Sequence, residues 1–194
     1  LNHRIGRLAA ILAAHDFTAG HRIATWLPKT ELACLMPLAA VRAGLVHVPI
    51  NPLLKAAQVK HIPTDSGAKA LVTAKVRAEQ LGDGDVPEGA VILDEAETLA
   101  AIDAHGDVLP PLSLDTDTNS LAAIFYTSGS TGRPKGVMLS HANLAIGAVS
   151  VASYLKLAAD DVTLAVLPLS FDYGQNQLLS TWQAGGCVVP LDYL

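Results

Sequence analysis

The residues best suited to chemistry lie at positions 126–137, in the sequence YTSGSTGRPKGV. Glycines such as Gly129 and Gly132 let a backbone come close to a ligand, and successive backbone amides in such a turn form a concave site for anionic oxygens. Lys135 adds a positive charge, and Pro134 restricts the backbone before it. Four hydroxyl side chains can donate further hydrogen bonds: Thr127, Ser128, Ser130 and Thr131. The stretch therefore predicts a phosphate-binding loop.

The spacing of this loop excludes three familiar alternatives. A Walker loop needs Gly-Lys-Ser/Thr at a fixed distance from its first glycine, and neither Gly129 nor Gly132 meets that rule. The dinucleotide pattern G-x-G-x-x-G and the hydrolase pattern G-x-S-x-G are also missing from this stretch. A flexible Ser/Gly linker is the plain alternative. Linkers seldom contain Pro-Lys-Gly followed by a strand and a capped helix, so we favour a binding loop.

The loop must be positioned by the elements around it. The apolar run at 121–125 is typical of a strand buried on both faces. The loop then leaves the carboxyl end of a strand, where open α/β sheets bind their ligands. A second strand is expected at 136–139, and Ser140 is placed to cap a helix from His141 to about Tyr154.

The chain before the loop alternates between helical and strand patterns. We expect a short strand that contains His47, with His47 in a structural role, and we expect Pro63 to end its helix early. The expected helices cover residues 5–13, 31–43, 55–61, 74–81 and 95–105, and the other strands cover 22–27, 70–73 and 90–93. This alternation predicts a parallel sheet.

A second candidate site follows the expected strand at 162–167, in the sequence LPLSFDYGQ at 167–175. This stretch lies at a strand's carboxyl end, before a helix expected at 177–184. Substrates of α/β proteins bind at that edge of the sheet. The aspartate, Asp172, has a second interpretation as a residue that caps the following helix. Four side chains are candidates for a substrate pocket: Phe171, Asp172, Tyr173 and Gln175.

Composition and charge narrow the class of protein. A chain of 194 residues with 51% hydrophobic content can bury a substantial core. The Pro-, Asp- and Ser-rich stretch at 106–119 suggests a boundary between residues 1–118 and residues 119–194. A net charge of −5 with scattered basic residues provides no basic patch for nucleic acid.

Cysteine usage and hydropathy bear on the compartment. Cys34 and Cys187 both lie in apolar runs, so we expect buried reduced thiols and a cytoplasmic location. The longest apolar region, 32–50, contains Pro37, Arg42 and Gly44, which argues against a transmembrane segment.

Residues 126–144 closely resemble the AMP-binding signature of the adenylate-forming superfamily, and residues 42–52 resemble its second core motif. The chain is most similar to an AMP-forming acyl-CoA ligase along essentially its whole length. The resemblance implies an α/β fold with stacked β-sheets flanked by helices, the N-terminal part of the adenylate-forming fold, incomplete at its C-terminus. Residues 119–194 would be the truncated AMP-binding region.

The resemblance also implies a reaction. A carboxylate attacks the α-phosphate of ATP, pyrophosphate leaves, and the acyl-adenylate passes its acyl group to coenzyme A. Lys135 and Thr131 would be catalytic, and Thr127 would also bind Mg²⁺. The residues implied to hold the β- and γ-phosphates are Thr127, Ser128, Gly129, Ser130, Thr131, Gly132 and Lys135.

Two departures from the acyl-CoA ligase pattern leave alternatives open. Phe171 stands where typical acyl-CoA ligases have a histidine. The Phe-Asp pair is instead similar to amino-acid adenylation domains, in which the aspartate binds the substrate's α-amino group and a carrier protein accepts the product. A non-catalytic nucleotide-binding module is the more distant alternative. The sequence leaves the acid, the thiol acceptor and the oligomeric state open.

Several parts that the family implies are absent from these 194 residues. They are a magnesium-binding glutamate, a ribose-binding aspartate, and a hinge followed by a lid domain with a lysine. We therefore expect an N-terminal fragment that is inactive alone and leaves apolar faces uncovered.

Overall fold

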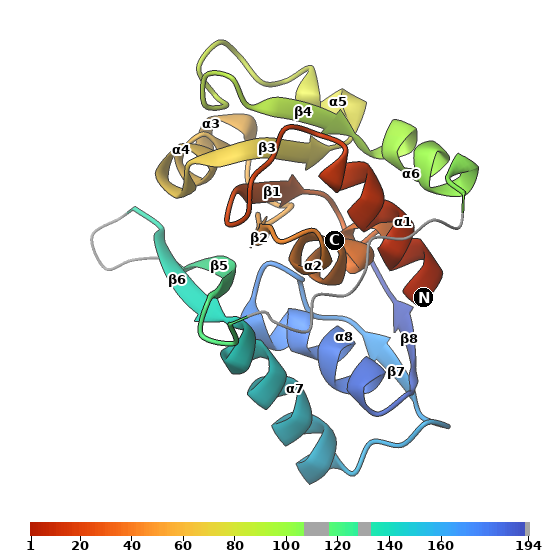
Figure 1. Cartoon of the computed structure of the whole chain (residues 1–194). Helices are drawn as coiled ribbons and strands as arrows, with labels where there is room; N and C mark the ends of the chain where they lie inside the picture. Colours follow the sequence, from red (N-terminus) through yellow and green to blue (C-terminus); the bar gives the residue numbers. More distant parts are fainter. Residues whose placement is uncertain (107–116, 128–132, 193–194) are drawn as a thin grey trace.

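The strands form a six-stranded sheet and a separate two-stranded sheet in the computed structural model, which describes residues 1–106, 117–127 and 133–192. The large sheet has the order β4-β3-β1-β2-β5-β6, and the small sheet pairs β7 with β8 (Figure 1). The strands are β1 (Arg22–Trp26), β2 (Val46–Pro49), β3 (Ala68–Thr73), β4 (Val91–Asp94), β5 (Leu121–Thr127), β6 (Lys135–Ser140), β7 (Val162–Ala165) and β8 (Cys187–Pro190).

The helices alternate with these strands along most of the chain. They are α1 (Asn2–Ala13), α2 (Glu31–Arg42), α3 (Ala56–Val59), α4 (His61–Ser66), α5 (Lys75–Ala78), α6 (Glu95–Ala104), α7 (His141–Leu155) and α8 (Asp172–Gln183). In the large sheet, each adjacent pair from β4 to β5 is parallel, while β6 runs antiparallel to β5. The predicted α/β class with a parallel sheet is confirmed, and the β5–β6 hairpin adds one antiparallel edge strand.

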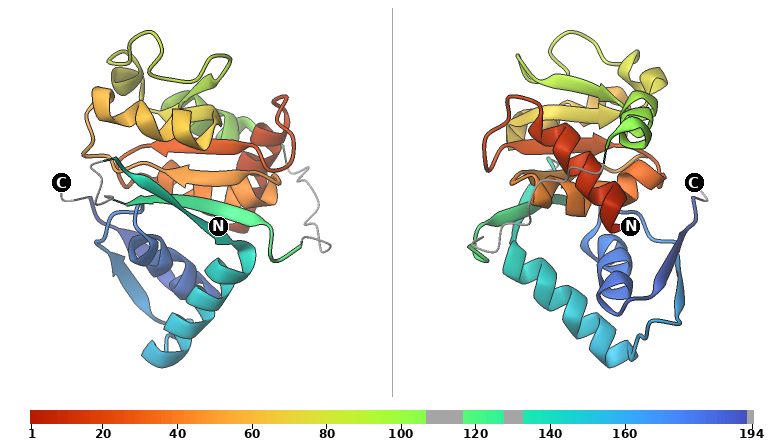
Figure 2. Two further views of the ribbon diagram at one scale, coloured as in Figure 1. Left: turned by 90° about the vertical axis from the view of Figure 1, so that its left-hand side faces the viewer. Right: turned by 45° about the vertical axis from the view of Figure 1, so that its right-hand side comes forward.

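Each face of the large sheet buries its own hydrophobic core. Helices α1 and α2 cover one face with Leu8, Leu12 and Met36, and α4 covers the other with Ile62. The apolar residues of β1 lie in both cores, which explains why most positions of the parallel strands are apolar on either face. In both views of Figure 2, α7, α8 and the small sheet lie below this layered part.

Two predicted helix starts are confirmed by their capping contacts. The Thr30 side chain accepts a hydrogen bond from the Ala33 amide at the start of α2. Ser140 and Asn143 form a reciprocal capping box at the start of α7. Gly44 follows α2 with a φ of +75°, a conformation that few other residues adopt.

The prediction that Pro63 ends its helix was wrong. Pro63 lies in the first turn of α4, which continues to Ser66. A proline is tolerated there because the first backbone amides of a helix have no partner within the helix. The break falls earlier, between α3 and α4. Helix α5 is also shorter than the expected 74–81.

Helix α8 begins at Asp172, five residues before the predicted start at 177. The helix therefore includes Gly174, whose backbone packs against residue 168: a Cβ added at Gly174 would lie 1.9 Å from the Pro168 carbonyl oxygen. This glycine permits close packing inside a helix, whereas the expected helix left it out.

The small sheet and α7 are much more exposed than the large sheet. Strand β8 exposes Cys187, whereas Cys34 on α2 is buried, so the prediction of two buried thiols holds only for Cys34. Burial raises the pKa of Cys34 to about 11. The boundary expected between residues 118 and 119 stays a prediction.

Candidate functional site

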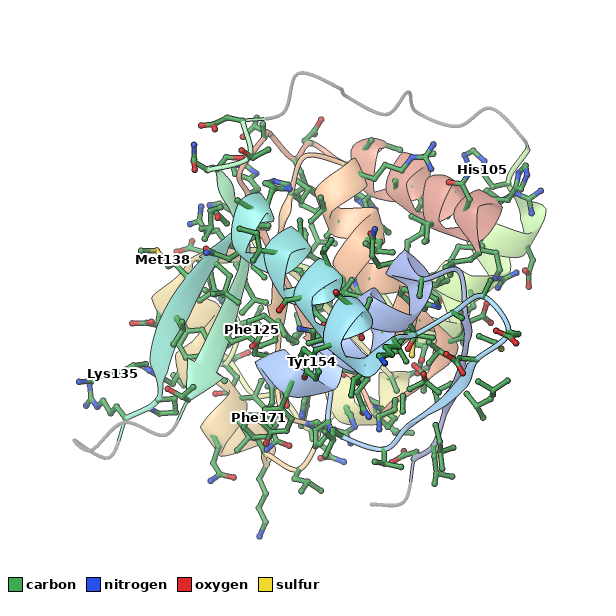
Figure 3. The ribbon with its side chains drawn as sticks, turned by 90° about the horizontal axis from the view of Figure 1, so that it is seen from below. His105, Phe125, Lys135, Met138, Tyr154 and Phe171 are labelled. Carbon is green, nitrogen blue, oxygen red and sulfur yellow. The ribbon has the colours of Figure 1, made fainter. Side chains whose placement is uncertain are left out.

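The predicted phosphate loop connects the two strands of the β5–β6 hairpin. Thr127 ends β5, Lys135 begins β6, and the two residues are paired across the hairpin. Both are exposed, and the Lys135 side chain extends outward at the end of the hairpin (Figure 3). The other residues assigned to phosphate lie outside the described part of the chain: Ser128, Gly129, Ser130, Thr131 and Gly132.

Helix α4 contacts both strands of this hairpin near the loop. The Tyr126 hydroxyl donates a hydrogen bond of 2.6 Å to Asp65 Oδ2. His61 Nε2 lies 2.9 Å from the Pro134 carbonyl oxygen, which can only accept, so Nε2 carries the proton. Burial, followed by the hydrogen bond to Asp65, raises the pKa of Tyr126 well above its ordinary range. Tyr126 is therefore a neutral donor at physiological pH.

The second predicted group lies at the start of α8. Phe171 is the residue before the helix, and its ring stacks on the ring of Tyr173, with centroids 5.7 Å apart and planes 4° apart. Asp172 is exposed in the first helical turn and does not cap the helix. A carboxylate in this turn is favoured by the positive end of the helix.

Asp172 and Gln175 line one cavity between α7 and α8. Its volume is about 200 Å³. The cavity combines polar and apolar side chains: Leu139, Asn143, Leu144, Asp172, Gln175, Asn176 and Leu179. Neither Thr127 nor Lys135 lines it, so the described residues place the two predicted groups at separate positions.

His47 is fully buried, and it links the large sheet to α8. Its Nε2 lies 2.9 Å from the Thr25 hydroxyl. Burial lowers the pKa of His47 to about 3, and the adjacent Gln175 side chain offsets only part of that effect. No described residue meets hydrogen-bond geometry with His47 Nδ1 or with the Gln175 amide, although the two side chains are neighbours. The structural role predicted for His47 agrees with this neutral, buried state.

The carboxyl ends of β1, β2 and β7 converge on a small cavity of about 30 Å³, lined by Thr25, His47 and Ser170 among others. Lys29 holds the small sheet at this edge. Its ammonium group donates to the carbonyl oxygens of Ala165, at 2.8 Å, and Leu191, at 3.2 Å. Burial lowers the pKa of Lys29, with Cys34 and Asp192 opposing the change.

Sequence reasoning missed His61, Asp65 and Lys29 as residues that position the site. Their partners are 61 to 162 positions away along the chain, so no local pattern signals these contacts. The only usable signal was Tyr126, which immediately precedes the hydroxyl-rich loop and has a phenol that needs a partner when buried.

No cluster of three or more His, Cys, Asp or Glu side chains that could hold a metal ion occurs within 1–106, 117–127 and 133–192. Over the same ranges, no helix is both long and apolar enough to cross a bilayer.

The chain is similar to several characterised proteins. It is 37% identical to the L-proline–[L-prolyl-carrier protein] ligase of Pseudomonas fluorescens, over 74% of this chain and 29% of that protein. It is 34% identical to a feruloyl-CoA synthase of Amycolatopsis, over 97% of this chain and 37% of that protein. The chain thus spans about a third of the length of these curated relatives.

The fold matches solved structures over nearly the whole chain. The crystal structure of ATP-bound MatB from Rhodopseudomonas palustris superposes with a TM-score of 0.86 at 30% identity, covering 99% of this chain and 39% of that one. The model of the AMP-binding enzyme family matches residues 1–193. Together with the parallel sheet and the β5–β6 strand pair, these matches show that the chain belongs to the AMP-binding, adenylate-forming enzyme family.

Proposed function

We propose that this chain forms the ATP-binding part of an enzyme that activates a carboxylic acid as its acyl-adenylate and passes the acyl group to the thiol of coenzyme A. The observation that carries the proposal is the hairpin, which holds Thr127 and Lys135 opposite each other at the ends of a glycine- and hydroxyl-rich loop. Lys135 has no acidic partner that would neutralise it among the described ion pairs.

The first step joins two anions. A carboxylate oxygen attacks the α-phosphorus of ATP, the bond from that phosphorus to the bridging oxygen breaks, and pyrophosphate leaves. Because an anion approaches a polyanion, catalysis depends on charge neutralisation and in-line positioning rather than on a protein nucleophile. Lys135 would bind the leaving phosphates, and Thr127 would donate a hydrogen bond. Thr131, the second proposed catalytic residue, lies outside the described part.

Mg²⁺ fits this arrangement as a partner of the nucleotide. Magnesium usually binds through substrate phosphates, water and one or two protein ligands. The described residues offer no preformed cage, and the exposed Thr127 hydroxyl is suited to be one such ligand. Bound Mg²⁺ would neutralise phosphate charge. In the second step, a thiolate attacks the acyl carbonyl carbon and AMP leaves.

Pyrophosphate exchange into ATP tests the first step. The complete gene product, supplied with fatty, aryl and amino acids in turn, is expected to exchange labelled pyrophosphate into ATP with at least one acid. Lys135→Ala should lower kcat/KM for ATP roughly 10- to 100-fold, since a hydrogen bond to a charged group contributes about 1.5–3 kcal/mol. Lys156→Ala, which removes an exposed lysine after α7, is the matched control. Equal effects of the two changes would contradict the role of Lys135.

A second candidate function has a specific observation in its favour. Asp172 is an exposed carboxylate that lines the cavity between α7 and α8, beside the amides of Asn143 and Asn176. This chemistry suits the ammonium group of an amino acid, and the relative from Pseudomonas fluorescens is a ligase for L-proline on a carrier protein. We propose amino-acid activation, with transfer to a carrier-protein thiol, as the alternative.

The two candidates differ in their response to removal of the Asp172 charge. If the substrate is an amino acid, Asp172→Asn should lower kcat/KM for that acid about 10- to 100-fold, because a charge-assisted hydrogen bond is lost. Asp160→Asn, at an exposed turn, controls for net charge. Exchange that prefers acids without an amine, and that Asp172→Asn leaves unchanged, would exclude the amino-acid candidate.

A further inference from the structure

The contacts of α4 with the hairpin fall next to the two residues proposed to bind ATP. Asp65 accepts the hydrogen bond from Tyr126, which directly precedes Thr127. His61 donates to the carbonyl of Pro134, which directly precedes Lys135. The same helix therefore contacts the residue before each proposed ATP ligand, at a side chain in one case and at a backbone carbonyl in the other. Figure 1 shows α4 on the same side of the molecule as the hairpin.

Two residues of α4, His61 and Asp65, contact the hairpin on opposite sides of its loop. His61 and Asp65 are four positions apart, so their side chains lie on the same face of the helix, one turn from each other. Asp65 contacts the strand that enters the loop, and His61 contacts the segment that leaves it. Strand pairing fixes the separation of Thr127 and Lys135, and the helical turn of α4 contacts the hairpin on both sides of the loop.

The rest of the contact is built around the Tyr126 ring. The ring is buried, and it meets the His61 ring edge-on with centroids 6.1 Å apart. Gly136 lies opposite Tyr126 on β6, and a Cβ there would be 2.8 Å from the Ile124 side chain and 3.2 Å from the Tyr126 ring. The absence of a side chain at position 136 thus leaves the space in which the phenol reaches Asp65.

We propose that His61 and Asp65 are positioning residues for the adenylation reaction: through Pro134 and Tyr126 they hold Lys135 and Thr127 in the arrangement that binds the phosphates of ATP. This inference rests on the proposed function. It assigns to α4 a role in ATP binding, although α4 contributes none of the proposed ATP ligands.

The test measures KM for ATP and KM for the acid separately in the complete gene product, by pyrophosphate exchange. Tyr126→Phe removes only the hydroxyl, and Asp65→Ala removes its acceptor. Each is expected to raise KM for ATP roughly tenfold, as for the loss of one charge-assisted hydrogen bond, and to leave KM for the acid unchanged. Tyr154→Phe, which removes the same atom from an exposed tyrosine on α7, is the matched control.

Two further variants separate positioning from general stability. His61→Ala should raise KM for ATP, and His61→Gln should restore it in part because an amide N–H can still donate to the Pro134 carbonyl. The double variant Tyr126→Phe with Asp65→Ala should be no worse than Asp65→Ala alone, since both remove the same hydrogen bond.

The outcomes distinguish this inference from the proposed function. Normal exchange with an unchanged KM for ATP in Tyr126→Phe and Asp65→Ala overturns the positioning role alone. An equal rise of both KM values together with a lower unfolding temperature overturns it too, because that result indicates a structural role only. In a third outcome, the wild type exchanges pyrophosphate with no acid, but calorimetry finds that both variants bind ATP roughly tenfold more weakly. That result overturns the proposed reaction and supports the positioning role.

Discussion

The central strands of the six-stranded sheet are more completely buried than the two-stranded sheet, whereas the edge strands β4 and β6 of the large sheet bury no residue. Strand β2 is buried at every position and β1 at all but its first, whereas β7 buries only Ala165 and β8 buries no residue. Helices and their two cores enclose the central strands of the large sheet. The small sheet joins the core mainly through Ala165, and α8 joins it through Leu178.

This difference shows that strands in this chain can pair regularly without being buried. Strands β7 and β8 are paired in register and tied to the large sheet by Lys29, although much of their apolar surface is exposed. Apolar residues of α7, such as Ile146 and Tyr154, are exposed as well. The prediction that whole apolar faces are left uncovered stays a prediction.

The largest expected difference between the sheets is in the free energy of unfolding that is lost when one leucine of each sheet is replaced by alanine. Leu71→Ala on β3 empties a fully buried position and should lower the free energy of unfolding by about 2–5 kcal/mol. Leu164→Ala on β7, where the side chain is 51% exposed, should cost less than about 1 kcal/mol. Denaturant unfolding of the 194-residue chain measures both. Equal losses would show that the two sheets are equally stabilised by burial.

The reactivity of the two cysteines tests the same difference in burial between the sheets, and this test needs no substitution. Cys34 is buried beside the large sheet, and with a pKa of about 11 only about a thousandth of it is thiolate at pH 8. Cys187 on β8 is exposed. Alkylation of Cys187 should therefore be about 100-fold faster or more, as followed by mass spectrometry. Comparable rates would mean that the large sheet opens as readily as the small one.

A further expected effect is the pH dependence of stability that His47 causes, which appears only at acidic pH. The unfolded chain protonates this histidine below about pH 6.5, but the buried side chain resists protonation until about pH 3. The free energy of unfolding should therefore fall as the pH decreases through this window, by up to about 1.4 kcal/mol per pH unit.

The variant His47→Gln isolates this contribution. It should show a shallower pH dependence than the wild type between these limits, with His3→Gln, at an exposed position on α1, as the control. Identical slopes in the wild type and His47→Gln would show that groups other than His47 cause the pH dependence of stability.

Several parts of the fold were predictable because their causes are local. A cap such as Thr30 or Ser140 contacts an amide three residues away, so the start of a helix can be recognised from a short window. The apolar runs of the parallel strands and the hydroxyl-rich loop are local patterns of the same kind. These signals were sufficient for the α/β class and for the place of Thr127 and Lys135 at a strand end.

The remaining features depend on neighbours that are distant in the chain. The helix expected at 177–184 left out Gly174, because the sequence does not show the Pro168 carbonyl that packs against it. Cys187 was expected to be buried because an apolar run does not show whether another layer covers it. The antiparallel hairpin, the pairing of His47 with Thr25 and the cavity beside Asp172 likewise required the structure.

The sequence by itself determined which residues are candidates for the chemistry, because the charge of a residue such as Lys135 or Asp172 and the hydrogen bonds it can form follow from its type. Only the tertiary structure decided how those residues are held. Hydrogen bonds from His61 and to Asp65 span 73 and 61 positions, and such contacts form only when the chain has folded. Hydrogen bonding and burial act over a few ångströms in space, whereas a sequence pattern records only separation along the chain.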